Sequence, residues 1–159
     1  VVVENDASPM DQALSRALRR ALNARLPASC LAASEQAVQL AAEGVDTRRP
    51  DLLVVCGQER QGRYGLLNPT AIIEILSPSS LHDLTTKADA YAAISSVVGY
   101  VVVSQDEPRA YVHRERASGL FSPIVIHRGG WVEIPGTGAS IDVDALFEQA
   151  RAALADPVE

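Results

Sequence analysis

Two carboxylates in apolar segments are the residues of this chain whose types and spacing could do chemistry. Asp51 stands at the start of the apolar run 52–56, and Glu74 interrupts the run 70–76. Both runs have the length and composition of strands that are covered on both faces of a sheet. A charged group inside such a strand costs several kcal/mol unless it is paired or bound to a cation. On neighbouring strands, the two side chains would form a hard-oxygen site for a divalent metal ion.

The order of Asp51, Glu74 and Lys87 along the chain resembles that of the PD-(D/E)XK nuclease superfamily. A closer resemblance is to the Uma-two family of restriction-endonuclease-like proteins, and it covers roughly residues 7–147. The motifs that carry it are, in order, RRPDLLVVCG, NPTAIIEILSPSS, DLTTKADAY and GYVVVSQDEPRAYVHRE. The resemblance implies an endonuclease that hydrolyses the phosphodiester bonds of DNA. It also implies one α+β domain over residues 1–159, with a restriction-endonuclease-like mixed β-sheet flanked by helices.

The same resemblance gives the candidate residues their roles. Asp51 and Glu74 would hold Mg²⁺ or Mn²⁺, together with the backbone carbonyl of Ile75. Lys87 would support the attacking water and offset charge on the phosphate. In the usual superfamily pattern this lysine lies two residues after the glutamate, where the present chain has Leu76. The amine must therefore come from the segment that follows the strand.

Further residues could support this site. Asp83 lies four residues before Lys87 and could pair with it across one helical turn. Tyr91, four residues after Lys87, could hydrogen-bond into the same pocket. Asp11 or Gln12 could face the site from the first helix and contribute an oxygen.

Each candidate also has a structural interpretation. Asp51 could be a turn residue at the start of a strand, and Glu74 could be paired with a buried arginine or lysine. Lys87 could be a surface lysine paired with Asp83. Tyr91 could belong to the core, so sequence alone leaves these alternatives open.

Two other functions compete with the nuclease. Many family members have a histidine after a Ser-Pro pair at the start of the first helix, but here Met10 follows Ser8 and Pro9. This departure and the net charge of −6 favour a catalytically degenerate module that binds a protein or nucleic-acid partner. A metal-dependent hydrolase of a smaller phosphate ester is a third interpretation.

Composition and charge constrain the class of protein. The chain has 159 residues, of which 47% are hydrophobic, enough for one domain with a core. It shows neither a membrane-length apolar run nor a signal-peptide pattern, so we expect a cytoplasmic protein without membrane contact. A homodimer would suit two-strand cleavage, and C₂ pairing is the commonest assembly. Because the chain begins with Val1, we expect the native N-terminus, where relatives carry a further strand and a glutamate, to be incomplete here.

Cysteines and arginines give weaker signals. Cys30 and Cys56 are far apart and form no C-x-x-C motif, which predicts two buried reduced thiols in a cytosolic protein and no zinc site. The arginines form two local clusters that could be either DNA contacts or solvated faces. The clusters are Arg16, Arg19, Arg20 and Arg25, and Arg109, Arg114 and Arg116.

The elements that must position these residues follow from hydrophobic spacing and turn residues. Ser8 and Pro9 begin a helix with an apolar stripe, which Pro27 ends. Strands are expected at 30–33, 36–41, 50–56, 70–76, 100–103 and 109–114, with a helix at 83–95. Residues 121–126 and 131–134 are expected to pair as a hairpin around 128–130. Asp142 or Asp144 would cap a closing helix that runs to about residue 155.

Overall fold

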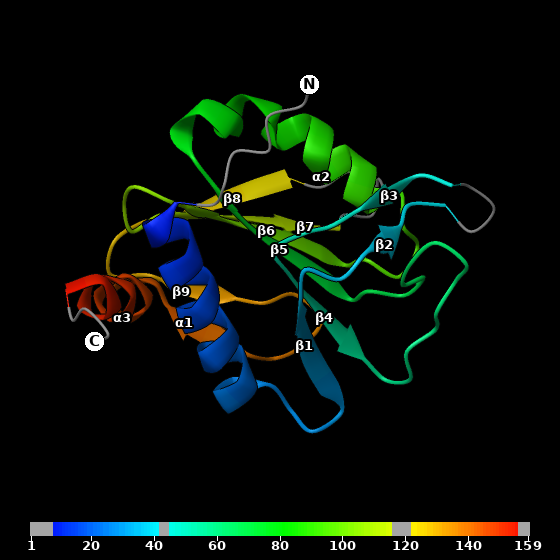
Figure 1. Cartoon of the computed structure of the whole chain (residues 1–159), viewed down its shortest axis with the longest axis horizontal. Helices are drawn as coiled ribbons and strands as arrows, with labels where there is room; N and C mark the ends of the chain where they lie inside the picture. Colours follow the sequence, from blue (N-terminus) through cyan, green and yellow to red (C-terminus); the bar gives the residue numbers. More distant parts are fainter. Residues whose placement is uncertain (1–7, 42–44, 116–121, 156–159) are drawn as a thin grey trace.

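The protein is built around a mixed β-sheet, which Figure 1 shows in a computed structural model. The structure describes residues 8–41, 45–115 and 122–155. Within these ranges the main sheet has six strands in the order β1-β4-β5-β6-β7-β8. Their bounds are β1 Cys30–Ser34, β4 Leu52–Cys56, β5 Ala71–Leu76, β6 Gly99–Ser104, β7 Ala110–Arg114 and β8 Ser122–Ile126. The predicted α+β fold with a mixed sheet in one domain is confirmed.

Strands β5 and β6 are the centre of the sheet and run parallel, whereas the other neighbouring pairs are antiparallel. Parallel neighbours require a crossover, and here it consists of the 3₁₀ helix Pro78–Asp83 and helix α2, Leu84–Ala92. Every residue of β5 and β6 is buried. Their continuous apolar sequences are explained by coverage of both faces of the sheet.

Helices cover the two faces unequally, with α2 on one side and α1 and α3 on the other (Figure 1). Helix α1, Pro9–Arg25, begins as predicted: the Ser8 hydroxyl accepts a hydrogen bond from the Asp11 backbone N–H at 3.1 Å. Helix α3, Val143–Ala155, is capped by Asp142, whose Oδ1 accepts from the backbone N–H groups of Asp144 and Ala145. No helix in the described ranges is long and apolar enough to cross a membrane.

Two short hairpins complete the fold. The first pairs β2, Val38–Gln39, with β3, Thr47–Arg48, and lies beside α2 (Figure 1). The second pairs β9, Trp131–Glu133, with β10, Ser140–Asp142. Val38 packs into the core on the α2 face, whereas Val132 and Ile141 pack into the core on the α1 face.

The predicted hairpin between 121–126 and 131–134 is wrong. Strand β8 instead pairs with β7, and β9 pairs with β10. The expected turn does form, with Gly129 at a φ of 83° and the Gly130 N–H bonded to the His127 carbonyl. The chain then leaves the sheet, and Val132 is buried in the core cluster that includes residues of α1 and α3. Residue 121 lies outside the described ranges.

The prediction of two reduced thiols is also wrong, because Cys30 and Cys56 form a disulfide. The two residues are directly opposite each other in the antiparallel register of β1 and β4. Their separation of 26 residues along the chain gives no indication of this register. The bond ties the edge strand β1 to the strand that Asp51 precedes.

Candidate active site

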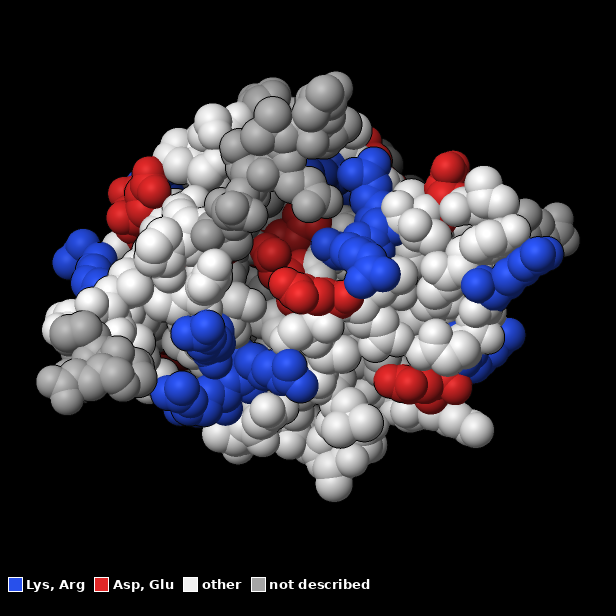
Figure 2. Space-filling view, in the orientation of Figure 1, with Lys and Arg blue, Asp and Glu red and all other residues white. Residues whose placement is uncertain are grey.

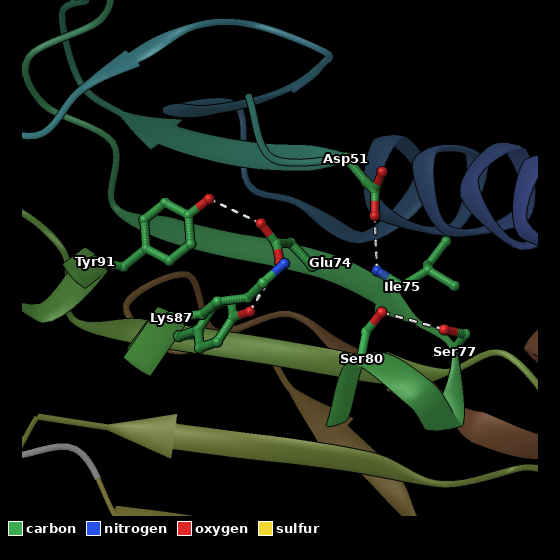
Figure 3. A network of polar contacts seen from close by, with 8 residues as sticks. Asp51, Glu74, Ile75, Ser77, Ser80, Lys87 and Tyr91 are labelled. Atoms are coloured by element: carbon green, nitrogen blue, oxygen red, sulfur yellow. Dashed lines mark hydrogen bonds and ion pairs between the residues drawn. The ribbon is translucent and has the colours of Figure 1, made fainter. Parts of the chain in front are cut away.

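Glu74 is the most deeply buried acidic side chain of the candidate site, with 7% of its surface exposed. It lies in β5 and points to the α2 face of the sheet (Figure 3). Its Oε1 accepts a hydrogen bond from the Tyr91 hydroxyl at 2.8 Å, and its Oε2 accepts one from the Tyr100 hydroxyl at 2.9 Å. The Lys87 ammonium lies 3.4 Å from Oε2. These donors offset the cost of burying a carboxylate.

The donors around Glu74 come from the two elements that follow β5. Lys87 and Tyr91 are one turn apart on α2, and Tyr100 lies on β6, which pairs with β5. Burial and the Glu74 carboxylate together raise the pKa of both tyrosines far above their ordinary value. The two hydroxyls therefore remain protonated and keep donating to Glu74 throughout the physiological pH range.

Asp51 lies at the edge of the same region, immediately before β4. The register pairs Leu52 with Ile73, so Asp51 is one residue beyond the ladder and opposite Glu74. Its Oδ2 accepts a hydrogen bond from the Ile75 backbone N–H at 2.8 Å (Figure 3). In a strand the N–H and C=O of one residue point to the same side. The Ile75 carbonyl is therefore directed toward Asp51, as the Ile75 N–H is.

The electrostatics of Asp51 differ from those of an ordinary surface carboxylate. Burial raises its pKa to about 6, and repulsion from Asp11 and Glu74 adds to this effect. The hydrogen bond from Ile75 and the charge of Lys87 act in the opposite direction but do not cancel it. Burial also raises the pKa of Asp11. Carboxylates whose charge is disfavoured in this way would gain from a nearby cation.

Two hollows are lined by residues of the site, one by Glu74 and the other by Asp51. One, of about 530 Å³, is lined by Leu40, Asp46, Thr47, Arg48, Arg49, Glu74, Lys87 and Tyr91. The other, of about 300 Å³, is lined by Asp11, Gln12, Ser15, Arg16, Glu35 and Asp51. Figure 2 shows acidic side chains in the depression at the centre of the molecule, with basic side chains beside them.

The structure brings most of the predicted residues together. Glu74, Lys87 and Tyr91 are in direct contact, Asp51 bonds to the Ile75 backbone, and Asp11 is close enough to raise the pKa of Asp51. Tyr91 is buried in the core and also donates a hydrogen bond to Glu74. The structural and the functional interpretation of Tyr91 are therefore compatible.

The predicted pairing of Asp83 with Lys87 is not tested, because the side chain of Asp83 lies outside the described part of the molecule. Within that part, Lys87 is ion-paired with Glu74. The expected pairing of Glu74 with a lysine is therefore present in the structure. Lys87 is not buried, however, because 27% of its side chain is exposed.

Sequence reasoning missed Tyr100, Arg48 and Arg49. Tyr100 opens an apolar strand, and its hydroxyl meets Glu74 only because β5 and β6 run parallel. The two arginines directly precede the Pro50–Asp51 pair, which was the one available signal. They line the larger hollow with Glu74 and Lys87.

The oxygen atoms of the site limit which metal ion it could hold. In the described ranges, no three side chains of His, Cys, Asp or Glu converge to hold an ion. Mg²⁺ is usually held by one or two carboxylates and keeps several waters. Asp51 and Glu74 with the carbonyl of Ile75 would fit such a sparse oxygen set.

Comparison with known proteins gives a family and a fold. The family model "Uma2: Putative restriction endonuclease" matches residues 3–144, which confirms the resemblance seen in the sequence motifs. A solved structure of "a putative nuclease belonging to DUF820" from Anabaena variabilis is similar, with a TM-score of 0.71 and 18% identity over 89% of this chain and 82% of that chain. At this identity the likeness shows the fold. No curated protein matches the sequence significantly.

Proposed function

We propose, because the chain belongs to the Uma2 family of "putative restriction endonucleases", that it is a metal-dependent endonuclease that hydrolyses phosphodiester bonds of DNA. The observation that carries the proposal is the buried Glu74 carboxylate, which lies opposite Asp51 and is ion-paired to Lys87. A buried anion of this kind beside an open cavity is typical of a catalytic site. The acidic and basic groups around it suit the two needs of phosphodiester hydrolysis, which are a bound cation and stabilised phosphate charge.

Asp51, Glu74 and the carbonyl of Ile75 would hold Mg²⁺ or Mn²⁺. When bound, the ion would lower the pKa of a water and offset charge on the phosphate. Asp51 is oriented for this by its hydrogen bond from the Ile75 N–H, and Glu74 by its two tyrosine donors. Both carboxylates are thus fixed before any substrate enters, which is the arrangement that lowers reorganisation in catalysis.

Lys87 would supply the amine that the superfamily places two residues after the glutamate. Its ammonium reaches Glu74 from α2, and its partly exposed side chain borders the larger hollow. From this position it could donate to a phosphate oxygen or hold the attacking water.

A catalytically degenerate binding module is the second candidate. The observation that favours it is that Tyr91, Tyr100 and Lys87 together already contact both oxygens of the Glu74 carboxylate. Such a module would keep the fold and bind its partner without a metal ion.

The test is a calorimetric titration of Mn²⁺ into the wild type and into Glu74→Gln, combined with cleavage of plasmid and oligonucleotide DNA. We prefer Gln to Ala because an amide oxygen can still accept from Tyr91 or Tyr100. The nuclease requires Mn²⁺ binding and cleavage by the wild type and the loss of both in a folded variant. Absence of binding to both proteins would favour the degenerate module.

A smaller substrate is checked in the same assay with an aryl phosphodiester. If the protein turns over this compound faster than DNA, the proposed substrate becomes a small phosphate ester instead of DNA. A cytoplasmic location and a homodimer, which would present two sites to two strands, belong to the same proposal. Light scattering during size-exclusion chromatography would measure the mass of the assembly.

A further inference from the structure

We propose that Arg48 and Arg49 bind the phosphates that flank the scissile one, so that the β2–β3 hairpin is the element that contacts the DNA strand. This inference rests on the proposed nuclease function and names how its site would hold the substrate. No metal ligand is involved, so the two proposals can be tested separately.

The two arginines line the same hollow as Glu74 and Lys87. The hollow of about 530 Å³ has one wall from the β2–β3 hairpin, which contributes Arg48 and the adjoining Arg49. Glu74 lies at its base, and Lys87 and Tyr91 form the wall on the α2 side. A strand bound in this hollow would therefore pass between the hairpin and α2, directly over the candidate catalytic carboxylate.

The guanidinium groups of Arg48 and Arg49 are accessible to a ligand. Both arginine side chains are exposed, and in the described part of the chain neither is ion-paired to a carboxylate. Arg49 donates one hydrogen bond, from Nη1 to the Glu35 carbonyl at 3.1 Å, which fixes the side chain and leaves its other N–H groups for a ligand. The charge of Arg48 reaches into the site, since it acts to lower the pKa of Tyr91.

The charge of the hollow differs in sign from the charge of the whole chain. The chain carries a net charge of −6, which repels DNA. The lining of the hollow instead has three cationic side chains, Arg48, Arg49 and Lys87, against two anionic ones, Asp46 and Glu74. Figure 2 shows this arrangement as basic side chains beside the acidic depression. Arginine suits phosphate particularly well because its planar fork can donate two parallel hydrogen bonds.

The lining also indicates what is recognised. Tyr91 is the aromatic residue among the described lining residues, and its ring is buried against Tyr100. The hollow thus offers cations for phosphates and no open aromatic face for stacking bases. Contacts of this kind position a strand without reading its sequence.

The experiment measures binding of a fluorescein-labelled DNA duplex by fluorescence anisotropy, in EDTA and at several salt concentrations. The test variant is Arg48→Gln/Arg49→Gln, and the matched control is Arg128→Gln/Arg151→Gln, which removes two exposed charges outside the hollow. We expect the test variant to bind at least tenfold more weakly and the control within twofold of the wild type. The slope of log K against log salt should fall in magnitude by about 2, since each lost phosphate contact removes about 1.

A further measurement separates this inference from the proposed function. The test variant should bind Mn²⁺ as the wild type does, since neither arginine is a proposed metal ligand. Wild-type DNA affinity in the test variant, no duplex binding by the wild type, or loss of Mn²⁺ binding in the test variant would each overturn the inference. The nuclease proposal would still stand or fall on the Mn²⁺ binding and DNA cleavage that depend on Glu74.

Discussion

At the scale of single residues, Glu74 is the side chain on which the site depends. A carboxylate in the middle of a fully buried strand requires donors, and the structure supplies Tyr91, Tyr100 and Lys87. Burial and the Glu74 carboxylate raise the pKa of both tyrosines, so at neutral pH the two hydroxyls keep the protons that they donate to Glu74. Glu74 is accordingly held in one orientation by donors from α2 and β6.

This network predicts different stabilities for two substitutions at Glu74. Glu74→Ala leaves two buried hydroxyls without their acceptor and should lower the free energy of unfolding by about 3 kcal/mol. Glu74→Gln keeps one acceptor oxygen and should cost about 1 kcal/mol. Urea denaturation followed by circular dichroism measures both values. Equal losses for the two variants would mean that the tyrosine contacts add little.

The charge of Asp51 should lower the stability of the metal-free protein at neutral pH. Its folded pKa of about 6 lies above the ordinary 3.8, so the folded state holds more protons than the unfolded state between these values. The metal-free protein therefore loses stability as the pH rises from about 4 to about 6, and the penalty is complete above that range. Asp51→Asn removes this penalty and keeps an oxygen for the Ile75 N–H.

The expected gain at pH 7.5 is about 1 kcal/mol after allowance for the partial exposure of Asp51. For a chain of this size that corresponds to a rise of roughly 2–4 °C in Tm. Calorimetry on metal-free protein should show this rise at pH 7.5 and almost none at pH 4. An Asp51→Asn variant that melts lower at both pH values would contradict the burial argument.

At the scale of elements, the crossover from β5 through α2 to β6 assembles the site. A lysine on α2 can replace one on β5 because α2 packs over the face to which Glu74 points. Lys87 and Tyr91 reach the two oxygens of the same carboxylate because they are one helical turn apart. In the proposed function, Lys87 on this helix would thereby supply the amine that the superfamily places at the position of Leu76.

The disulfide between β1 and β4 gives a prediction at the same scale. Closing a loop with a separation of 26 residues should stabilise the protein by about 3 kcal/mol in the chain-entropy model. Reduction, or Cys30→Ser/Cys56→Ser, should then lower Tm by roughly 6–12 °C. A thiol titration of the denatured protein, before and after reduction, checks the bond itself. Two reactive thiols before reduction would show that the bond is absent.

Elements that depend on local sequence were predicted well, and those that depend on pairing were not. The start of α1 follows from Ser8 and Pro9, and the buried strands follow from continuous apolar runs. The hairpin expected between 121–126 and 131–134 failed because two adjacent strands can each prefer another partner. The Cys30–Cys56 bond was missed for the same reason, since register between distant strands leaves no mark on the sequence.

The residues of the site also differ in whether local sequence or strand pairing reveals them. Asp51 and Glu74 were visible because a charge in an apolar run is a local anomaly. Tyr100 was not, because its contact with Glu74 arises from the parallel pairing of β5 and β6. Arg48 and Arg49 look like ordinary surface charges until the hairpin is placed beside α2.

At the scale of the whole molecule, two groups of basic side chains are candidates for contact with the proposed DNA substrate. One lines the hollow beside Glu74, and Figure 2 shows basic side chains also over the region of α1. The arginines of α1 are Arg16, Arg19, Arg20 and Arg25. Two of them already have partners: Arg19 donates to the Ser34 hydroxyl, and Arg25 lies 5.4 Å from the centre of the Trp131 ring. We therefore expect the basic side chains of the hollow to contribute more to DNA binding than the arginines of α1.

The salt dependence of duplex binding distinguishes these two surfaces. Each phosphate neutralised by a cation contributes about 0.9 to the slope of log K against log salt. Arg48, Arg49 and Lys87 alone would give a slope of about −2.7, whereas engagement of the α1 arginines as well would bring it to about −6. Because the net charge of −6 opposes association, binding should also be weak at physiological salt. Anisotropy titrations at four salt concentrations measure the slope, and a value near −6 would show that the DNA path extends across α1.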